Sequence, residues 1–353
     1  MLLSISLHFL VIVLISLLAV VLLLIFAVLL YGLLQYRKQV SIESWSAEID
    51  AVIAGAIVNG GEVPGRINNS GIAQRPAYRR LMLEKLISAE KKFSGGAGLI
   101  IRSLFNKNGL EKESLSKLGQ KRTHLIAGGI LELTAMRVGK ALPAISRLLH
   151  HPSPQVYQEA QYSVVTFNGF EGLNFLNDAQ GILSEWQQLR LLNSIPEVPP
   201  DSEGMLREWL QSANPSVTVF VLRIISKYQL LNMYADVLAL FSHPNIQIRL
   251  QAVETLQTLE NAETLSDYIS SYETQPDEVK VEIINSICKM SDIRAADFFR
   301  QKLLGNDSVA ARIGAAKGLH GLNLSGELQS LASKSCSPSE LVSIIKHVLQ
   351  EKI

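Results

Sequence analysis

A pattern of helical spacing recurs along most of the chain. Between Leu240 and Leu259, a Pro-Asn turn precedes Ile248, Ala252 and Leu256, which are four residues apart and therefore share one face of a helix. Copies of this triplet begin at Leu125, Val156, Gln187, Val219, Ile248, Val279, Ala311 and Leu341. Their spacing of about 31 residues lies in the range that indicates helical repeats. The sequence therefore predicts a stack of helical hairpins.

Each copy is preceded by a second apolar segment and a short polar turn. The turns contain Pro, Asn, Asp or Ser, which cap a helix start by accepting hydrogen bonds from otherwise unpaired N–H groups. Small residues such as Ala252 and Ala315 let paired helices approach closely. The copy at Val219 is weak, because Arg223 takes the small-residue position. We expect an all-α fold in which residues 116–353 form the repeat array.

The clearest copies carry a further pattern of an Asx turn, a cation, then Ala and Leu. It is present in "HPNIQIRLQAVETL" and "GNDSVAARIGAAKGL", and more loosely in "QPDEVKVEIINSI". In this pattern the chain resembles the HEAT-repeat (Armadillo-like helical) family over about two-thirds of its length. The resemblance implies an α–α superhelix of about eight hairpins, a HEAT-like solenoid whose surface binds protein partners.

Three cations occupy the same position of this pattern: Arg249, Lys280 and Arg312. One interpretation is a ladder of hydrogen bonds to turn residues of the same or adjoining repeats, such as Asn245, Asp277 and Asp307. The other is a cationic stripe that binds an acidic peptide. Truncation of Arg249 separates the two, because only the ladder predicts a loss of thermal stability.

The N-terminal segment has the composition of a membrane anchor. Residues 1–36 contain no Lys, Arg, Asp or Glu, and about 20 apolar residues suffice to span a bilayer. A signal peptide is disfavoured because no basic residue precedes the apolar run, and a buried apolar helix is the other alternative. Arg37 and Lys38 follow directly, so we expect a single-pass protein of the cytoplasmic (inner) membrane, with the N-terminus outside and the repeats in the cytoplasm.

Charge divides the rest of the chain. We expect a juxtamembrane linker with a short amphipathic helix at 37–75, followed by basic membrane-proximal helices at 76–115. From Arg75 to Arg147 there are 15 Lys and Arg against five Glu, whereas from Leu148 onward there are 15 basic and 23 acidic residues. The basic segment either contacts anionic lipid head groups or is a solvated helix surface. Nucleic acid is not expected, since no aromatic residues are interleaved with the cations.

Residues typical of catalysis are not arranged in any recognisable motif. Cys288 and Cys336 form no CxxC pair, and the histidines lack metal-ligand spacing, with His151 and His243 explained as turn residues. "FSGGAGLII" lacks the Lys-Ser/Thr of a phosphate loop. We therefore expect no enzyme, no cofactor and no metal. Trp186 and Trp209 follow a Glu in similar segments, and either could be a core residue or an exposed partner anchor.

These observations predict a non-enzymatic scaffold or adaptor, anchored in the membrane, that binds protein partners. The alternative is an accessory subunit of a membrane enzyme complex for envelope or exopolysaccharide synthesis. It comes from the order of "EKKFSGGAGLIIRSLFNKNGL", the repeats and "GFEGLNFL", which resembles bacterial single-pass membrane-anchored HEAT-repeat proteins of undefined activity. Some of these are encoded beside membrane glycosyltransferases.

Overall fold

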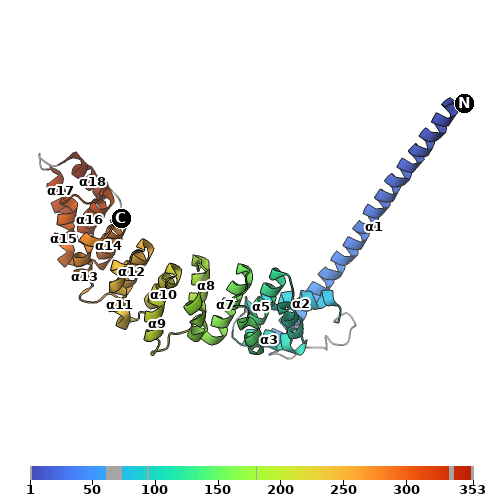
Figure 1. The fold of residues 1–353 in the computed structure, drawn as a ribbon, viewed down its shortest axis with the longest axis horizontal. Coiled ribbons are helices and arrows are strands. Elements are labelled where there is room, and N and C mark those ends of the chain that lie inside the picture. The colour runs from blue at the N-terminus through green and yellow to red at the C-terminus, as the bar shows by residue number, and fades with distance from the viewer. Residues whose placement is uncertain (1, 61–73, 94, 180, 334–337, 351–353) are drawn as a thin grey trace. The chain divides into compact units, whose positions relative to one another are not determined.

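The fold is all-helical, as predicted (Figure 1). The computed structural model describes residues 2–60, 74–93, 95–179, 181–333 and 338–350, and within these ranges every regular element is an α-helix or a 3₁₀ helix. The chain divides into two compact units, Met1–Ser163 (unit 1) and Val164–Ile353 (unit 2). Unit 2 is a stack of helical hairpins, whereas unit 1 combines one very long helix with shorter ones.

Unit 1 begins with one very long helix. Its elements are α1 (Leu2–Val58), α2 (Pro76–Glu90), α3 (Gly96–Lys107), α4 (Glu111–Leu118), α5 (Thr123–Ala135), η2 (Gly139–Ala141), α6 (Leu142–Ser146) and most of α7 (Pro154–Asn168). The short amphipathic helix expected as a separate element within 37–75 is instead the end of α1. No Pro or Gly lies between Tyr36 and Gly55 to end the helix there. The later part of that linker, 61–73, lies outside the described residues.

The end of α1 belongs to the core of unit 1. Ile49, Ile53 and Ala56 are buried, at the spacing of one helix face, and α1 packs there against α2 and α3. The ring of Trp45 lies edge-on to that of Tyr78 at the start of α2, with centroids 5.9 Å apart. From Phe9 to Val40, by contrast, the described side chains of α1 are exposed.

Unit 2 continues the hairpins to the end of the described chain. Its first segment holds η3 (Gly169–Asp178), α8 (Glu185–Ser194), α9 (Glu203–Leu210), α10 (Pro215–Lys227), η4 (Leu231–Met233), α11 (Tyr234–Ala239), η5 (Leu240–Ser242) and α12 (Ile246–Thr258). The rest holds α13 (Thr264–Ser271), η6 (Tyr272–Thr274), α14 (Asp277–Met290), η7 (Ile293–Ala295), α15 (Ala296–Leu304), α16 (Val309–Gly321), α17 (Ser325–Ser333) and α18 (Ser339–Gln350). The second helices α10, α12, α14, α16 and α18 each pack against the next.

A helix lies at all eight positions where the repeat pattern placed one: α5, α7, α8, α10, α12, α14, α16 and α18. Ile248, Ala252 and Leu256 of α12 are fully buried, as are the corresponding residues of α14. The predicted register of α10 was wrong. Val219 and Arg223 of α10 are only half-buried, and the buried face is formed by Val217, Val221 and Ile225. The true copy therefore begins at Val217, which makes the spacing more regular than the sequence suggested.

The turns before α10 and α12 share one hydrogen-bond scheme. The Asn245 side chain accepts from Gln247 N at 2.9 Å and caps α12, and Asn214 caps α10 through Ser216 N at 3.1 Å. Two residues before each Asn, a side chain accepts the backbone N–H of that Asn: His243 Nδ1 at 3.0 Å and Ser212 Oγ at 3.2 Å. His151 Nδ1 accepts from Ser153 N in the same way. These two histidines are turn residues, as expected.

Close helix packing depends on small residues in α16. A Cβ at Gly314 would lie 2.7 Å from Ile284 Cγ2 of α14, and one at Gly318 would lie 2.6 Å from the Phe299 ring of α15. Both distances are shorter than carbon atoms tolerate. The two glycines therefore set how closely α16 approaches its neighbours on both sides.

The Gly318→Ala variant tests this packing. The new methyl group must displace the buried Phe299 ring, so we expect the free energy of unfolding to fall by about 1–3 kcal/mol, measured by urea denaturation. Gly321→Ala in the same helix is the control, because nothing lies within 4 Å of its Cβ. It should be neutral or stabilising by up to about 1 kcal/mol. Equal effects of the two substitutions would contradict the packing explanation.

Candidate functional site

Arg249, near the start of α12, ties one hairpin to the next. Its Nε donates to the carbonyl of His243 in the preceding turn, and its Nη1 donates to Gln275 Oε1 at 3.3 Å. Gln275 itself is buried and donates to Phe241 O at 3.2 Å. The guanidinium thus lies between the turns of two successive hairpins.

Arg312 takes the same position in α16. Its Nε donates to Leu303 O at 3.1 Å, and its Nη1 lies 2.7 Å from Glu340 Oε2 at the start of α18. The Arg312 side chain is mostly buried. Both arginines therefore bond a carbonyl before their own helix, and each also bonds a side chain near the start of the next second helix, Gln275 just before α14 and Glu340 within α18. These partners differ from the turn side chains Asn245, Asp277 and Asp307 that the sequence suggested.

Lys280, the third member, stays within its own hairpin. Its Nζ lies 3.8 Å from Glu273 Oε2 and 5.2 Å from the centroid of the Tyr272 ring. The link to the next hairpin is made instead by Lys302 of α15, which also donates to Glu273. The structure thus brings the three predicted cations to equivalent places, where they contact different groups.

Lys302 is a residue that the sequence reasoning missed. It is buried, its Nζ lies 4.6 Å from the centroid of the Tyr272 ring, and it shares the apolar face of α15 with Phe298 and Leu303. A lysine at a core position of an amphipathic helix was the available signal. Its hydrogen bond lowers the pKa of Glu273 below the usual 4.5, against a smaller opposing effect of burial.

A second polar connection links the second helices α8, α10 and α12. Arg223 Nη1 donates to Gln188 Oε1 at 2.9 Å, and Arg223 Nε donates to Gln251 Oε1 at 3.1 Å. The residue that weakened the repeat pattern of α10 therefore joins α8 to α12. A planar guanidinium with several donors suits this bridging position.

An exposed apolar patch lies at the start of unit 2. Ile182, Trp186 and Leu189 are 80%, 73% and 51% exposed, and we name them the α8 patch. Trp186 and Leu189 are three residues apart on α8 and therefore share a face. Trp209, the other tryptophan of a Glu-Trp pair, is buried, and its indole N–H donates to Asn177 Oδ1. The two similar sequence segments thus give one core residue and one exposed residue.

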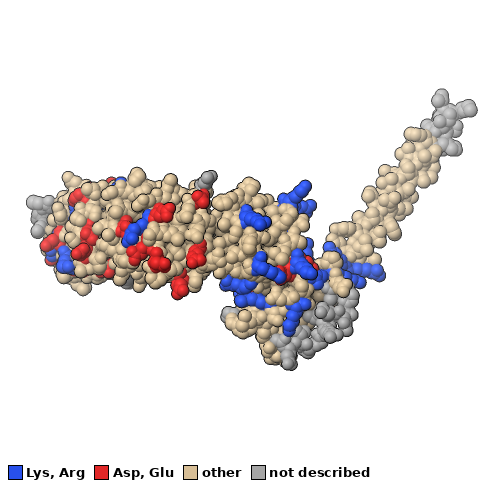
Figure 2. Space-filling model, turned by 60° about the horizontal axis from the view of Figure 1, so that its bottom comes forward, with Lys and Arg blue, Asp and Glu red and all other residues tan. Residues whose placement is uncertain are grey.

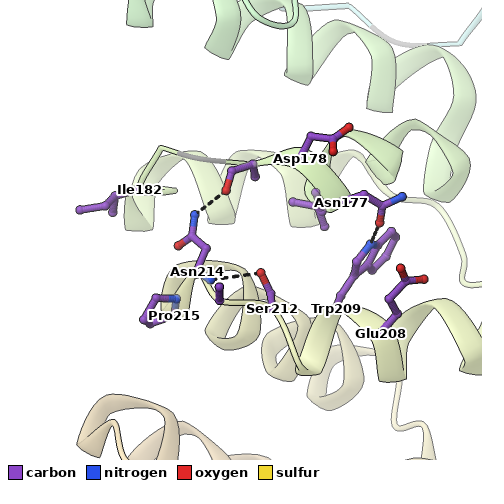
Figure 3. Close-up of a pocket in the computed structure, with 11 residues that line it drawn as sticks. Asn177, Asp178, Ile182, Glu208, Trp209, Ser212, Asn214 and Pro215 are labelled. Carbon is purple, nitrogen blue, oxygen red and sulfur yellow. Dashed lines mark hydrogen bonds between the residues drawn. The ribbon is translucent and has the colours of Figure 1, made fainter.

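A shallow cleft of about 830 Å³ adjoins this patch, and Ile182 lines it (Figure 3). Asn214 holds one wall, since its Nδ2 donates to the carbonyls of Ala179 and Gly181, both at 2.9 Å. The exposed carboxylates of Asp178 and Glu208 stand at the rim. The amide groups are thus used to fix the loop, while the two carboxylates remain available to a ligand.

The described residues hold no group of three or more His, Cys, Asp or Glu side chains placed to bind a metal ion. Burial raises the pKa of the Cys288 thiol to about 11, so it is protonated at neutral pH and a poor nucleophile. Cys336 lies outside the described residues.

Arg37 and Lys38 are exposed on α1, where the charge-free run ends. The part of α1 that precedes them is long and apolar enough to cross a membrane, and none of its most apolar stretch is buried within the protein. The two cations therefore mark one end of a candidate membrane span.

No protein-family model matches the sequence, and no curated protein matches it either. Solved helical proteins share its fold to a limited degree. YibA of Escherichia coli is 15% identical, with a TM-score of 0.40 over 76% of this chain and 97% of YibA. Human deoxyhypusine hydroxylase is 11% identical (TM-score 0.29, 87% of this chain and 96% of that chain). The complex of CpcE and CpcF of phycocyanin lyase from Nostoc is 12% identical (TM-score 0.26, 81% and 98%).

Truncation of Arg249 tests the ladder. Arg249→Ala removes both hydrogen bonds of a mostly enclosed cation, so we expect the free energy of unfolding to fall by about 1–3 kcal/mol, measured by thermal or urea denaturation. Arg294→Ala is the control, because Arg294 is exposed and bonds only to the nearby Asp292. Its loss should change stability little. An unchanged stability of Arg249→Ala would instead favour the cationic stripe.

The Glu273–Lys302 pair predicts a pH dependence. Because the folded pKa of Glu273 is lowered, its contribution to stability is complete above the usual 4.5 and is lost as the pH falls through the lowered value. We expect Glu273→Gln to be less stable than the wild type at neutral pH, and this difference to shrink on acidification. Urea denaturation across the pH range measures it. Glu278→Gln, at an exposed site of α14, is the control and should lower stability at neutral pH less than Glu273→Gln does.

Proposed function

We propose that the chain is a single-pass membrane protein whose helical repeats serve as an adaptor for a protein partner. From Phe9 to Tyr36, α1 is apolar on every side and exposed on every side. A helix of this composition needs an apolar environment around its whole circumference, and the described part of the protein supplies none. A bilayer supplies it.

The charges that flank the span support one orientation. Arg37 and Lys38 follow the apolar run, and cytoplasmic segments next to a span carry an excess of cations. On this basis the N-terminus lies outside, the repeats lie in the cytoplasm, and the membrane is the cytoplasmic membrane.

The α8 patch is the observation that supports partner binding. Isolated exposed apolar residues are common, but three within eight residues, one of them a tryptophan, are typical of a binding surface. Tryptophan is also enriched among the residues that dominate binding energy. The half-buried Val219, Leu250 and Val281 lie at the positions on α10, α12 and α14 that correspond to Leu189, and they extend this apolar character along the stack.

Charge around the patch indicates the nature of the partner. Glu185, next to Trp186, is 89% exposed, and Asp178 and Glu208 stand at the rim of the adjoining cleft. An acidic rim around an apolar anchor complements a partner that has basic residues around an apolar pocket. Anchoring by α1 would raise the concentration of such a partner at the membrane.

A comparison of patch variants tests the adaptor function. Tagged full-length protein is solubilised from membranes, and its captured proteins are compared with those of the double variant Trp186→Ala, Leu189→Ala. Loss of both anchors should weaken binding of the true partner by more than about tenfold. Ile293→Ala is the control, because Ile293 is equally exposed at the start of η7, away from the patch. Identical capture by patch and control variants, or none above background, would contradict the proposal.

A further inference from the structure

We propose that the end of unit 1 nearest the membrane span is a binding surface for anionic lipid head groups. This inference rests on the proposed anchoring by α1 and adds a specific lipid contact to it. The surface consists of Arg75, Arg80, Lys107 and Lys112, which we name the basic end. All four are exposed, and among the described residues none of them forms an ion pair.

The continuity of α1 fixes how far this surface lies from the apolar span. Trp45 packs on Tyr78 and is nine residues beyond Tyr36, which corresponds to about 14 Å along the helix. Arg75 precedes Tyr78 by three residues and lies one turn nearer to the span. A head-group layer is roughly 5–8 Å thick, and the Debye length at physiological salt is about 8 Å. Tilting of α1 brings Arg75 closer still.

Contacts along α1 and α2 show which end of unit 1 faces the span. Trp45 meets Tyr78, and Asp50 lies 2.6 Å from Lys85, so α2 runs parallel to α1 and begins at the end nearer the span. The 15 residues of α2 carry its other end about 22 Å further away.

The next helices bring further cations back to that end. Glu90 at the end of α2 pairs with Arg102 at 2.9 Å, whereas Arg79 near its start donates to Gly109 O at 3.3 Å. Helix α3 is therefore antiparallel to α2, and the turn between α3 and α4 lies beside the start of α2. Lys107 and Lys112 flank this turn.

The acids at this end are largely neutralised. Glu113 pairs with Arg79, and Glu111 lies 2.6 Å from Lys140. Glu43 and Glu48 on α1 and Glu84 on α2 are exposed and oppose the positive field, but the four cations of the basic end together with Arg37 and Lys38 outnumber them. Figure 2 shows Lys and Arg side chains gathered on unit 1 around the base of α1, whereas Asp and Glu side chains are scattered among uncharged ones over the face of unit 2 in view. The charge that faces the head groups is therefore positive.

Hydrogen exchange of the full-length chain in lipid nanodiscs tests the proposal. The chain is placed in phosphatidylcholine alone or in phosphatidylcholine mixed with phosphatidylglycerol. The first N–H groups of α2 have no partner within the helix, so they report directly on a covering surface. We expect their exchange, and that of the turn between α3 and α4, to slow by about fivefold or more in the anionic discs, and high salt to reverse this.

Two variants with the same number of charge changes distinguish an effect of the basic end from an effect of the protein's net charge. Arg75→Gln, Arg80→Gln, Lys107→Gln and Lys112→Gln together should abolish the lipid-dependent protection, since each cation contributes about fivefold to binding. The control changes Lys91, Lys92, Lys121 and Arg122 to Gln; these are exposed at the far end of α2 and at the turn between α4 and α5. It should keep the protection.

The outcomes distinguish this proposal from the anchoring on which it rests. Equal exchange in neutral and anionic discs, with the protein stably incorporated, would overturn the lipid surface and leave the anchor intact. An equal loss of lipid-dependent protection in both quadruple variants would also overturn the proposal, because the protection would then depend on net charge alone. A protein that does not incorporate into discs of either composition would overturn the anchor itself.

Discussion

The packing of each second helix against the next is the interaction on which the rest of unit 2 depends. A single hairpin cannot enclose its own apolar face, so α12 buries Ile248, Ala252 and Leu256 only because α10 and α14 flank it. The regular spacing of these helices also places Arg223, Arg249 and Arg312 where each reaches the following hairpin. The regular spacing of the buried apolar residues therefore determines where these arginines lie. Their hydrogen bonds add polar contacts between hairpins to the apolar packing.

The spacing of the buried apolar residues also explains how much of the fold could be predicted from the sequence. In α12, polar residues at Gln247, Arg249, Gln251 and Glu254 separate most of the apolar positions, so the register of Ile248, Ala252 and Leu256 could be read from the sequence. In "PSVTVFVLRIISKY" apolar residues occupy almost every position, and the pattern could not distinguish Val217 from Val219. The end of α1 was predicted as a separate helix because the composition changes at Arg37. Composition does not end a helix, however, when no Pro or Gly interrupts it.

The candidate site was less predictable, because it depends on contacts between distant residues. The position of Arg249 could be read from the repeat, but its bond to Gln275, 26 residues further on, could not. The sequence analysis did not single out Lys302, because its partners lie about 30 residues away, in the preceding hairpin. It is buried among Tyr272 and Phe298 and paired with Glu273. Trp186 and Trp209 looked alike in sequence, and only the fold of the preceding segment determines which of them is enclosed.

The unbroken course of α1 has a mechanical consequence. The charge-free run of 36 residues is longer than a bilayer requires, and a span of excess length adjusts to the bilayer by tilting. No hinge separates the span from Ile49 and Ile53, which are held in the core of unit 1. If α1 spans the membrane as proposed, a change in bilayer thickness that alters the tilt of α1 would be transmitted to unit 1 as a rotation. The helix would then couple unit 1 mechanically to the bilayer as well as anchor it.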